Sequence, residues 1–135
     1  MELATFGAVL SYAVELEKAL GALYRQAQAI APTDLADTFD QNAQACQKRE
    51  QLMERTRREQ VTEMILEPIR GFQSEDYVLS DAPAGGVQSK DLVAALRQAE
   101  ETAVRYYTDG ASHLSIPEVK RIFQRLAKEH AKACA

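Results

Sequence analysis

The sequence predicts an all-α protein that folds as a four-helix bundle built from two helical hairpins. First, residues that favour helix dominate the 135-residue chain, and its apolar residues recur every three or four positions in four segments. Second, most of the glycines and prolines gather between those segments. Third, the two halves of the chain resemble each other. The length suits a single domain spanning residues 1–135.

The first half of the chain contains two predicted helices. One is expected from about residue 2 to residue 30, where the chain reaches Pro32. The other is expected from about residue 34 to residue 66, before Pro68. The short link between them predicts an antiparallel hairpin. The apolar positions that define the two helices are Phe6, Leu10, Ala13, Leu20, Tyr24, Ala27, Leu35, Phe39, Ala43, Cys46 and Met53.

A long connection separates the two hairpins. Helical periodicity fails over residues 67–89, which is too long a stretch for a tight turn, so we expect a crossover packed along the bundle. A third helix is predicted over about 90–110, ending at Gly110, and a fourth over about 116–133. The apolar residues expected to dock the crossover are Ile69, Phe72, Tyr77, Val78 and Leu79.

The two halves repeat one pattern of residues. A glutamate precedes a tyrosine by seven positions in each half, as Glu17–Tyr24 and as Glu100–Tyr107. A phenylalanine then precedes a polar or sulfur-bearing residue by seven positions in each half. These pairs are Phe39–Cys46 and Phe123–His130. The pattern indicates an approximate internal duplication of one hairpin.

Glu17 and Glu100 both fall within apolar stripes, at matching points of the repeat. A buried carboxylate is costly unless it is paired, hydrogen-bonded or bound to a cation. We therefore expect both to face the bundle interior near a cation. The alternative is that both lie on helix flanks and reach water. The nearby tyrosines Tyr24, Tyr106 and Tyr107 could hydrogen-bond these carboxylates, but we expect large core side chains whose hydroxyls reach water.

Three segments carry a resemblance to a known family. They are Ala13-Val14-Glu15-Leu16-Glu17-Lys18-Ala19 with Tyr24, Ala99-Glu100-Glu101-Thr102-Ala103 with Tyr106-Tyr107, and Val119-Lys120-Arg121-Ile122-Phe123-Gln124-Arg125-Leu126-Ala127-Lys128-Glu129. They resemble the rubrerythrin branch of the ferritin-like superfamily. The resemblance implies a ferritin-like bundle with a di-iron site, held by one Glu from each of two helices and Glu-x-x-His from each of the other two.

The sequence departs from that ligand pattern at four of six positions. Glu17 and Glu100 match the two single glutamates. The second helix has Cys46 and Arg49 where the family has Glu and His, and the fourth has His130 and Ala133. A normal di-iron centre is therefore not expected. With two cysteines, the chain also lacks the four-cysteine iron domain of a full rubrerythrin.

Two interpretations of the site follow. In the first, no cofactor binds, and Arg49 enters the bundle to form a core ion network with Glu17 and Glu100, helped by a protonated His130. In the second, Glu17, Cys46, Glu100 and His130 bind a single tetrahedral iron or zinc ion. If the helix register differs from the one assumed here, neither interpretation of the site holds. No residue is assigned as catalytic.

Three functions are consistent with these patterns. The first is a binding or scaffold module, and the second is a metal-dependent oxidoreductase acting on iron, oxygen or peroxide. The third is a regulatory protein whose crossover docks a partner. The resemblance implies a homodimer. The net charge of −4 gives no reason to expect nucleic acid, and the absence of an apolar leader or span predicts a cytoplasmic protein that binds no membrane.

Overall fold

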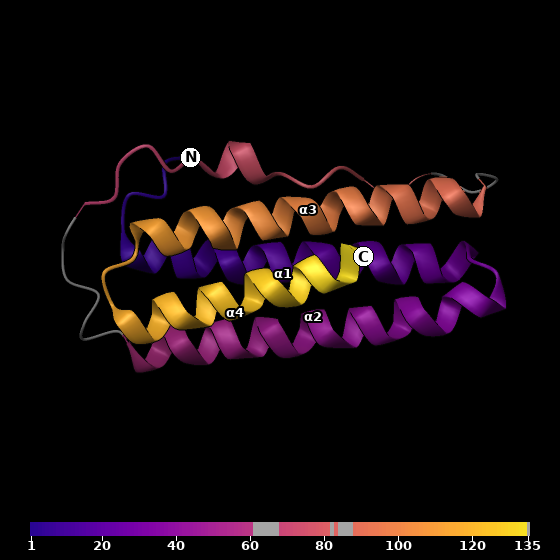
Figure 1. Cartoon of the computed structure of the whole chain (residues 1–135), viewed down its shortest axis with the longest axis horizontal. Coiled ribbons are helices and arrows are strands. Elements are labelled where there is room, and N and C mark those ends of the chain that lie inside the picture. Colours follow the sequence, from indigo (N-terminus) through magenta and orange to yellow (C-terminus); the bar gives the residue numbers. More distant parts are fainter. Residues whose placement is uncertain (61–67, 82, 84–87, 135) are drawn as a thin grey trace.

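A computed structural model describes residues 1–60, 68–81, 83 and 88–134, and the described part is all-helical, as predicted (Figure 1). Its only β-type pairing is an isolated bridge between Glu2 and Gln73. The elements are α1 (Phe6–Ile30), α2 (Thr33–Glu59), the 3-10 helix η2 (Ser74–Tyr77), α3 (Ser89–His113) and α4 (Pro117–Cys134).

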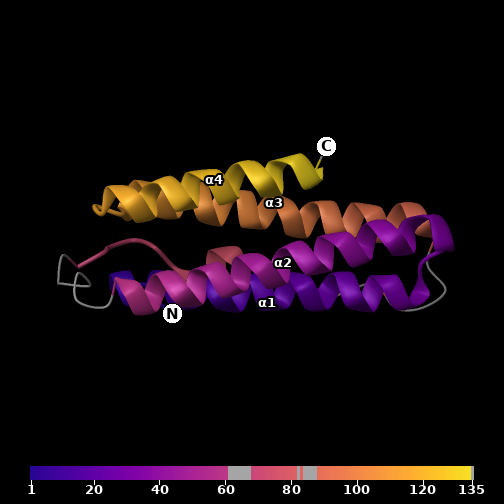
Figure 2. The same cartoon turned by 90° about the horizontal axis from the view of Figure 1, so that it is seen from below.

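The four helices form an elongated bundle of two layers (Figure 2). α1 packs mainly on α2, and α3 packs mainly on α4. Figure 1 shows that the members of each pair run in opposite directions. Fewer contacts join the pairs, and those lie between α1 and α3 and between α2 and α4. Among the described residues, no helix is long and apolar enough to cross a membrane.

The first helix begins at Phe6 and not at residue 2. Thr5 is its N-cap, and the Thr5 hydroxyl accepts a hydrogen bond from the Ala8 amide at 3.1 Å. The residues before it pair with the crossover, where the Leu3 amide donates to the Phe72 carbonyl at 2.7 Å. The backbone of residues 2–4 is thus held by long-range bonds in place of a first helical turn.

Gly110 does not end the third helix, which continues to His113. A Cβ atom at Gly110 would lie 2.8 Å from Cε2 of Phe123. The glycine therefore allows α3 and α4 to approach closely, and it is not a C-terminal cap. The second helix is described as far as Glu59, and its predicted extension through residues 61–66 lies outside the described residues.

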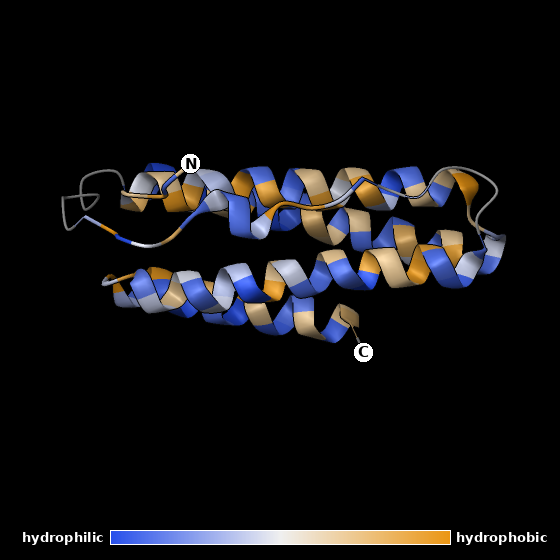
Figure 3. Ribbon diagram, turned by 90° about the horizontal axis from the view of Figure 1, so that it is seen from above, coloured by the Kyte–Doolittle hydropathy of each residue, from blue (hydrophilic) through white to orange (hydrophobic). Residues whose placement is uncertain are grey.

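Apolar and polar residues alternate around each helix (Figure 3), and one continuous core lies between the helices. The crossover contributes to this core through Phe72 and Tyr77, which are both buried. The Phe72 ring stacks on Tyr106 at 5.3 Å between centroids. Val78 was expected to dock but is 66% exposed, so that prediction is wrong. Its neighbour Tyr77 takes the inward position.

Candidate functional site

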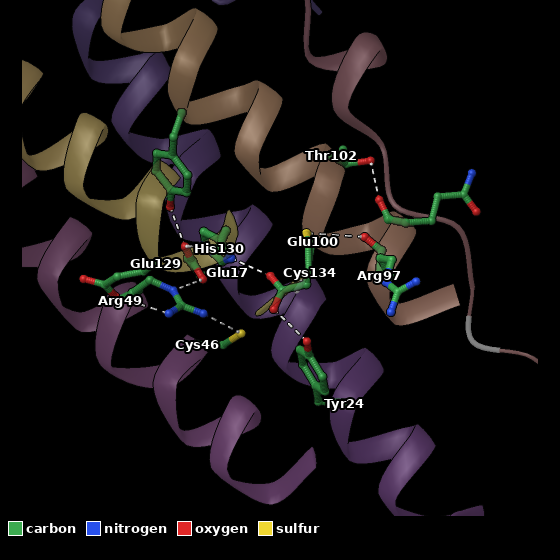
Figure 4. Close-up of polar contacts among 12 residues, drawn as sticks. Glu17, Tyr24, Cys46, Arg49, Arg97, Glu100, Thr102, Glu129, His130 and Cys134 are labelled. Carbon is green, nitrogen blue, oxygen red and sulfur yellow. Dashed lines mark hydrogen bonds and ion pairs between the residues drawn. The ribbon is translucent and has the colours of Figure 1, made fainter. Parts of the chain in front are cut away.

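Two buried glutamates face a histidine at the centre of the bundle (Figure 4). Glu17 of α1 and Glu100 of α3 are each 1% exposed, and His130 of α4 is fully buried. His130 Nε2 lies 2.8 Å from Oε2 of Glu17, and His130 Nδ1 lies 2.5 Å from Oε1 of Glu100. One imidazole ring therefore bridges the two carboxylates that the repeat places at matching positions.

When both carboxylates are ionised, the geometry makes His130 an imidazolium. An ionised carboxylate only accepts hydrogen bonds, so both ring nitrogens facing Glu17 and Glu100 must donate. Burial by itself lowers the pKa of His130, but its hydrogen bonds to Glu100 and Glu17 and the charge of Glu17 outweigh burial and raise the pKa from 6.5 to about 9. The ring is therefore charged at neutral pH.

Arg49 of α2 supplies the second cation. Its Nε donates to Oε1 of Glu17 at 3.0 Å, and its Nη2 donates to Sγ of Cys46 at 3.4 Å. Its Nη1 points the other way and donates to Oε1 of Glu129 at 3.4 Å. Arg49 is 8% exposed, so the guanidinium reaches from the bundle surface into the core.

Two tyrosines donate across the bundle in a reciprocal arrangement. The Tyr24 hydroxyl, from α1, donates to Oε2 of Glu100 at 2.6 Å. The Tyr107 hydroxyl, from α3, donates to Oε2 of Glu17 at 2.6 Å. Each tyrosine thus serves the glutamate of the other half of the repeat. We expected these hydroxyls to reach water, and that expectation is wrong, because each finds a carboxylate within the core.

The site is balanced in charge and in hydrogen bonds. The two carboxylates, Glu17 and Glu100, face two cations, Arg49 and His130. Burial raises the pKa of Glu17, but the hydrogen bond and charge of His130, with the charge of Arg49, outweigh burial and leave that pKa below its usual value. Among the described residues, no buried side-chain nitrogen or oxygen lacks a hydrogen-bond partner.

The residues present do not fit the di-iron centre that the resemblance implies. Both nitrogens of His130 carry protons and point at carboxylates, so neither offers a lone pair to a metal. The charge of Arg49 opposes a cation at the same place. Burial, followed by the charge of Glu17, raises the pKa of Cys46, so its sulfur is a thiol and not a thiolate ligand. In the described part of the chain, no three His, Cys, Asp or Glu side chains are grouped to hold a metal ion.

Glu129 is a site residue that the sequence reasoning missed. It stands one position before His130, about 100° around the helix from it, and neither interpretation of the site included it. In the structure its carboxylate contacts Arg49 from the surface side and also lies 3.5 Å from Nε of Arg125. Its spacing of four residues from Arg125 was the available signal, since such residues face each other on a helix.

Comparisons with protein-family models, curated proteins and solved structures found no match for this chain.

Proposed function

We propose that this protein is a non-catalytic bundle of the ferritin-like type, with two antiparallel hairpins joined by the crossover, and that it acts as a binding or scaffold module. In this proposal, organic cations take the place of the family's metal ions. His130 and Arg49 neutralise the two glutamates that would otherwise bridge a metal. The proposal explains why the framework residues resemble rubrerythrin while the ligand set does not.

The strongest support for the proposal is the position of the His130 ring. His130 lies between Glu17 and Glu100 with both ring nitrogens hydrogen-bonded to them, and its ring is stacked on Tyr107 at 5.5 Å between centroids. A metal held by both glutamates would need the space and the lone pairs that this ring uses. Oxidoreductase chemistry at the site would require the ring to leave a buried, stacked position.

The test compares metal loading with that of a variant designed to restore the family ligands. The variant carries Cys46→Glu, Arg49→His, His130→Glu and Ala133→His, which supply Glu-x-x-His on the second and fourth helices. After removal of metal and reloading with ferrous iron or zinc, the natural chain should retain far less than one ion per chain. The restored variant, if it folds by circular dichroism, should bind iron.

The natural chain should also leave peroxide-dependent oxidation of added ferrous iron at its uncatalysed rate. Stoichiometric iron or zinc in the natural chain, lost in Glu100→Ala, would overturn the proposal in favour of the metal-dependent oxidoreductase. If the restored variant fails to bind iron, metal loading of the natural chain still decides between the two functions.

The homodimer and the cytoplasmic location belong to the same proposal. The resemblance supports a dimer, since ferritin-like bundles pair through helix faces. The free state of Cys46 and Cys134 agrees with a reducing compartment. Light scattering coupled to size exclusion should give twice the 15.0 kDa chain mass, and a value of one chain mass would remove the dimer from the proposal.

A further inference from the structure

A basic groove runs along the surface between α2 and α4. It encloses about 580 Å³, part of which is open to solvent. Its polar walls are Lys48, Arg49 and Arg55 from α2 and Arg125 and Glu129 from α4. The groove lies where the two helix pairs meet, and Figure 4 shows the side chains of Arg49 and Glu129, two of its lining residues, in contact.

The groove concentrates positive charge on a protein whose net charge is −4. Four cationic side chains line it, with one carboxylate, Glu129. The carboxylate is shared, at 3.4 Å from Nη1 of Arg49 and 3.5 Å from Nε of Arg125. Arg49 is already paired with buried Glu17, so the excess positive charge comes from Lys48, Arg55 and Arg125, which outnumber the one carboxylate in the groove.

The remaining cations are weakly partnered. Arg55 lies 3.9 Å from Glu59, a distance beyond hydrogen bonding, and both side chains are more than 60% exposed. Lys48 makes no ion pair with any described residue. Their donors are therefore available to a ligand at the cost of hydration and side-chain freedom alone.

Arg49 is held in place before any ligand arrives. Its Nε is fixed by buried Glu17, and its Nη2 contacts Cys46, so Nη1 is the donor that faces the groove. A donor fixed in advance loses less entropy on binding than a free surface arginine. This link also joins the groove to the core network.

We infer that the groove binds a small phosphate-bearing anion, which replaces Glu129 between Arg49 and Arg125. A phosphate dianion matches the excess charge better than a carboxylate does. Its tetrahedral oxygens can accept from donors on both helices, and guanidinium groups pair with phosphate through two N–H groups at once. The inference rests on the core network of the proposed function in one respect, because Glu17 holds Arg49 in place; phosphate binding and metal loading are measured separately, so each can fail without the other.

The test is a titration of the folded protein with inorganic phosphate and then pyrophosphate, followed by amide and arginine Nε signals in NMR at constant ionic strength. We expect saturable shifts at Lys48, Arg55, Arg125 and Glu129. The Nε signal of Arg49 should move with them. Arg125→Gln should weaken binding about tenfold, the effect of one charge-assisted hydrogen bond.

Two further variants make the result specific. Glu129→Gln removes the competing carboxylate and should strengthen binding about tenfold, whereas loss of a merely structural contact would not. Arg121→Gln removes an equal charge from an exposed position of the same helix outside the groove and should leave the affinity unchanged.

Linear, unsaturable shifts would overturn the inference, as would equal weakening in Arg125→Gln and Arg121→Gln. Either outcome would mean that phosphate binds only through the general positive charge of the surface and not at a specific site. Binding of pyrophosphate but not phosphate would keep the inference and narrow the ligand to diphosphates.

Discussion

Each charged residue of the core site is defined by the group it faces. Glu17 accepts from Arg49, His130 and Tyr107, while Glu100 accepts from His130 and Tyr24. Removing one member leaves its partners buried without a compensating charge. The loss of stability is then larger than the net stabilisation that the whole network provides. The residue-scale predictions follow from this asymmetry.

The first prediction concerns the pH dependence of stability. The pKa of His130 is about 9 in the folded protein against 6.5 ordinarily, so its stabilisation is complete below pH 6.5 and lost as pH rises to about 9. The free energy of unfolding should fall by roughly 3 kcal/mol over that range because of this residue. Urea unfolding at several pH values measures the change. In His130→Gln the slope between pH 6.5 and 9 should largely disappear, and an unchanged slope would show that another group causes it.

The second prediction concerns the loss of one carboxylate. Glu17→Gln should lower the free energy of unfolding by about 3 kcal/mol, because the charges of Arg49 and His130 then remain buried with one acid between them. The matched control is Glu15→Gln, an exposed position two residues away on the same helix, which should change stability by less than about 0.5 kcal/mol. Denaturant titrations of both variants provide the comparison, and similar losses would contradict the network.

At the scale of elements, close packing and long-range backbone bonds decide where helices begin and continue. The α3–α4 contact requires a residue without a side chain at Gly110, and the start of α1 is set by the crossover segment that bonds to residues 3 and 4. Both features can be disturbed by single substitutions.

Gly110→Ala should destabilise the protein even though alanine favours helix by about 1 kcal/mol over glycine. The added Cβ would lie 2.8 Å from the fully buried ring of Phe123, and that ring is packed edge-on against Tyr107. We expect a net loss of about 1–2 kcal/mol. Gly21→Ala is the control, since its Cβ would meet Cys46 at 3.4 Å, an ordinary contact, and it should be neutral or stabilising. A gain in melting temperature for Gly110→Ala would refute the packing argument.

The crossover should be held by the segment that precedes α1. Leu3 is fully buried, and its amide bonds to Phe72. Leu3→Ala should therefore increase the rate of limited proteolysis within residues 68–81, as well as costing about 2–4 kcal/mol. Val78→Ala, at a position 66% exposed, should leave both quantities nearly unchanged. Rapid cleavage of the natural chain in this range would instead support a mobile segment, as the regulatory interpretation requires.

At the scale of the whole molecule, the site joins the two helix pairs. Tyr24 and Tyr107 each donate to the glutamate of the opposite pair, and His130 connects both glutamates. Residues in one hydrogen-bond network are coupled energetically.

Tyr24→Phe and Tyr107→Phe should each cost about 1.5 kcal/mol, because each leaves a carboxylate oxygen with one donor fewer. The loss of unfolding free energy in the double variant should differ from the sum of the two single losses by at least about 0.5 kcal/mol. A double-mutant cycle measured by chemical denaturation gives this coupling. Strict additivity would indicate that the two ends of the site act independently.

The sequence by itself determined the helical class, the approximate helix bounds and the positions of the unusual polar residues. These properties are local or periodic: helical spacing places Glu17 and Glu100 within apolar stripes, and glycine and proline mark the interruptions. The repeat also indicated which residues occupy matching places. The continuation of α3 through Gly110 was missed, because a glycine that ends a helix and one that admits a neighbouring ring look alike in sequence.

Only the tertiary structure decided which partners the polar residues take. The sequence left Arg49 and a metal as alternative cations, and it did not predict the reciprocal bonds of Tyr24 and Tyr107. The contacts that join the helices at this site link residues from 30 to 113 positions apart. They depend on the rotation and separation of helices, which are set by packing across the whole core and not by any local pattern. The same packing brings His130 between the two carboxylates, where it is their shared cation.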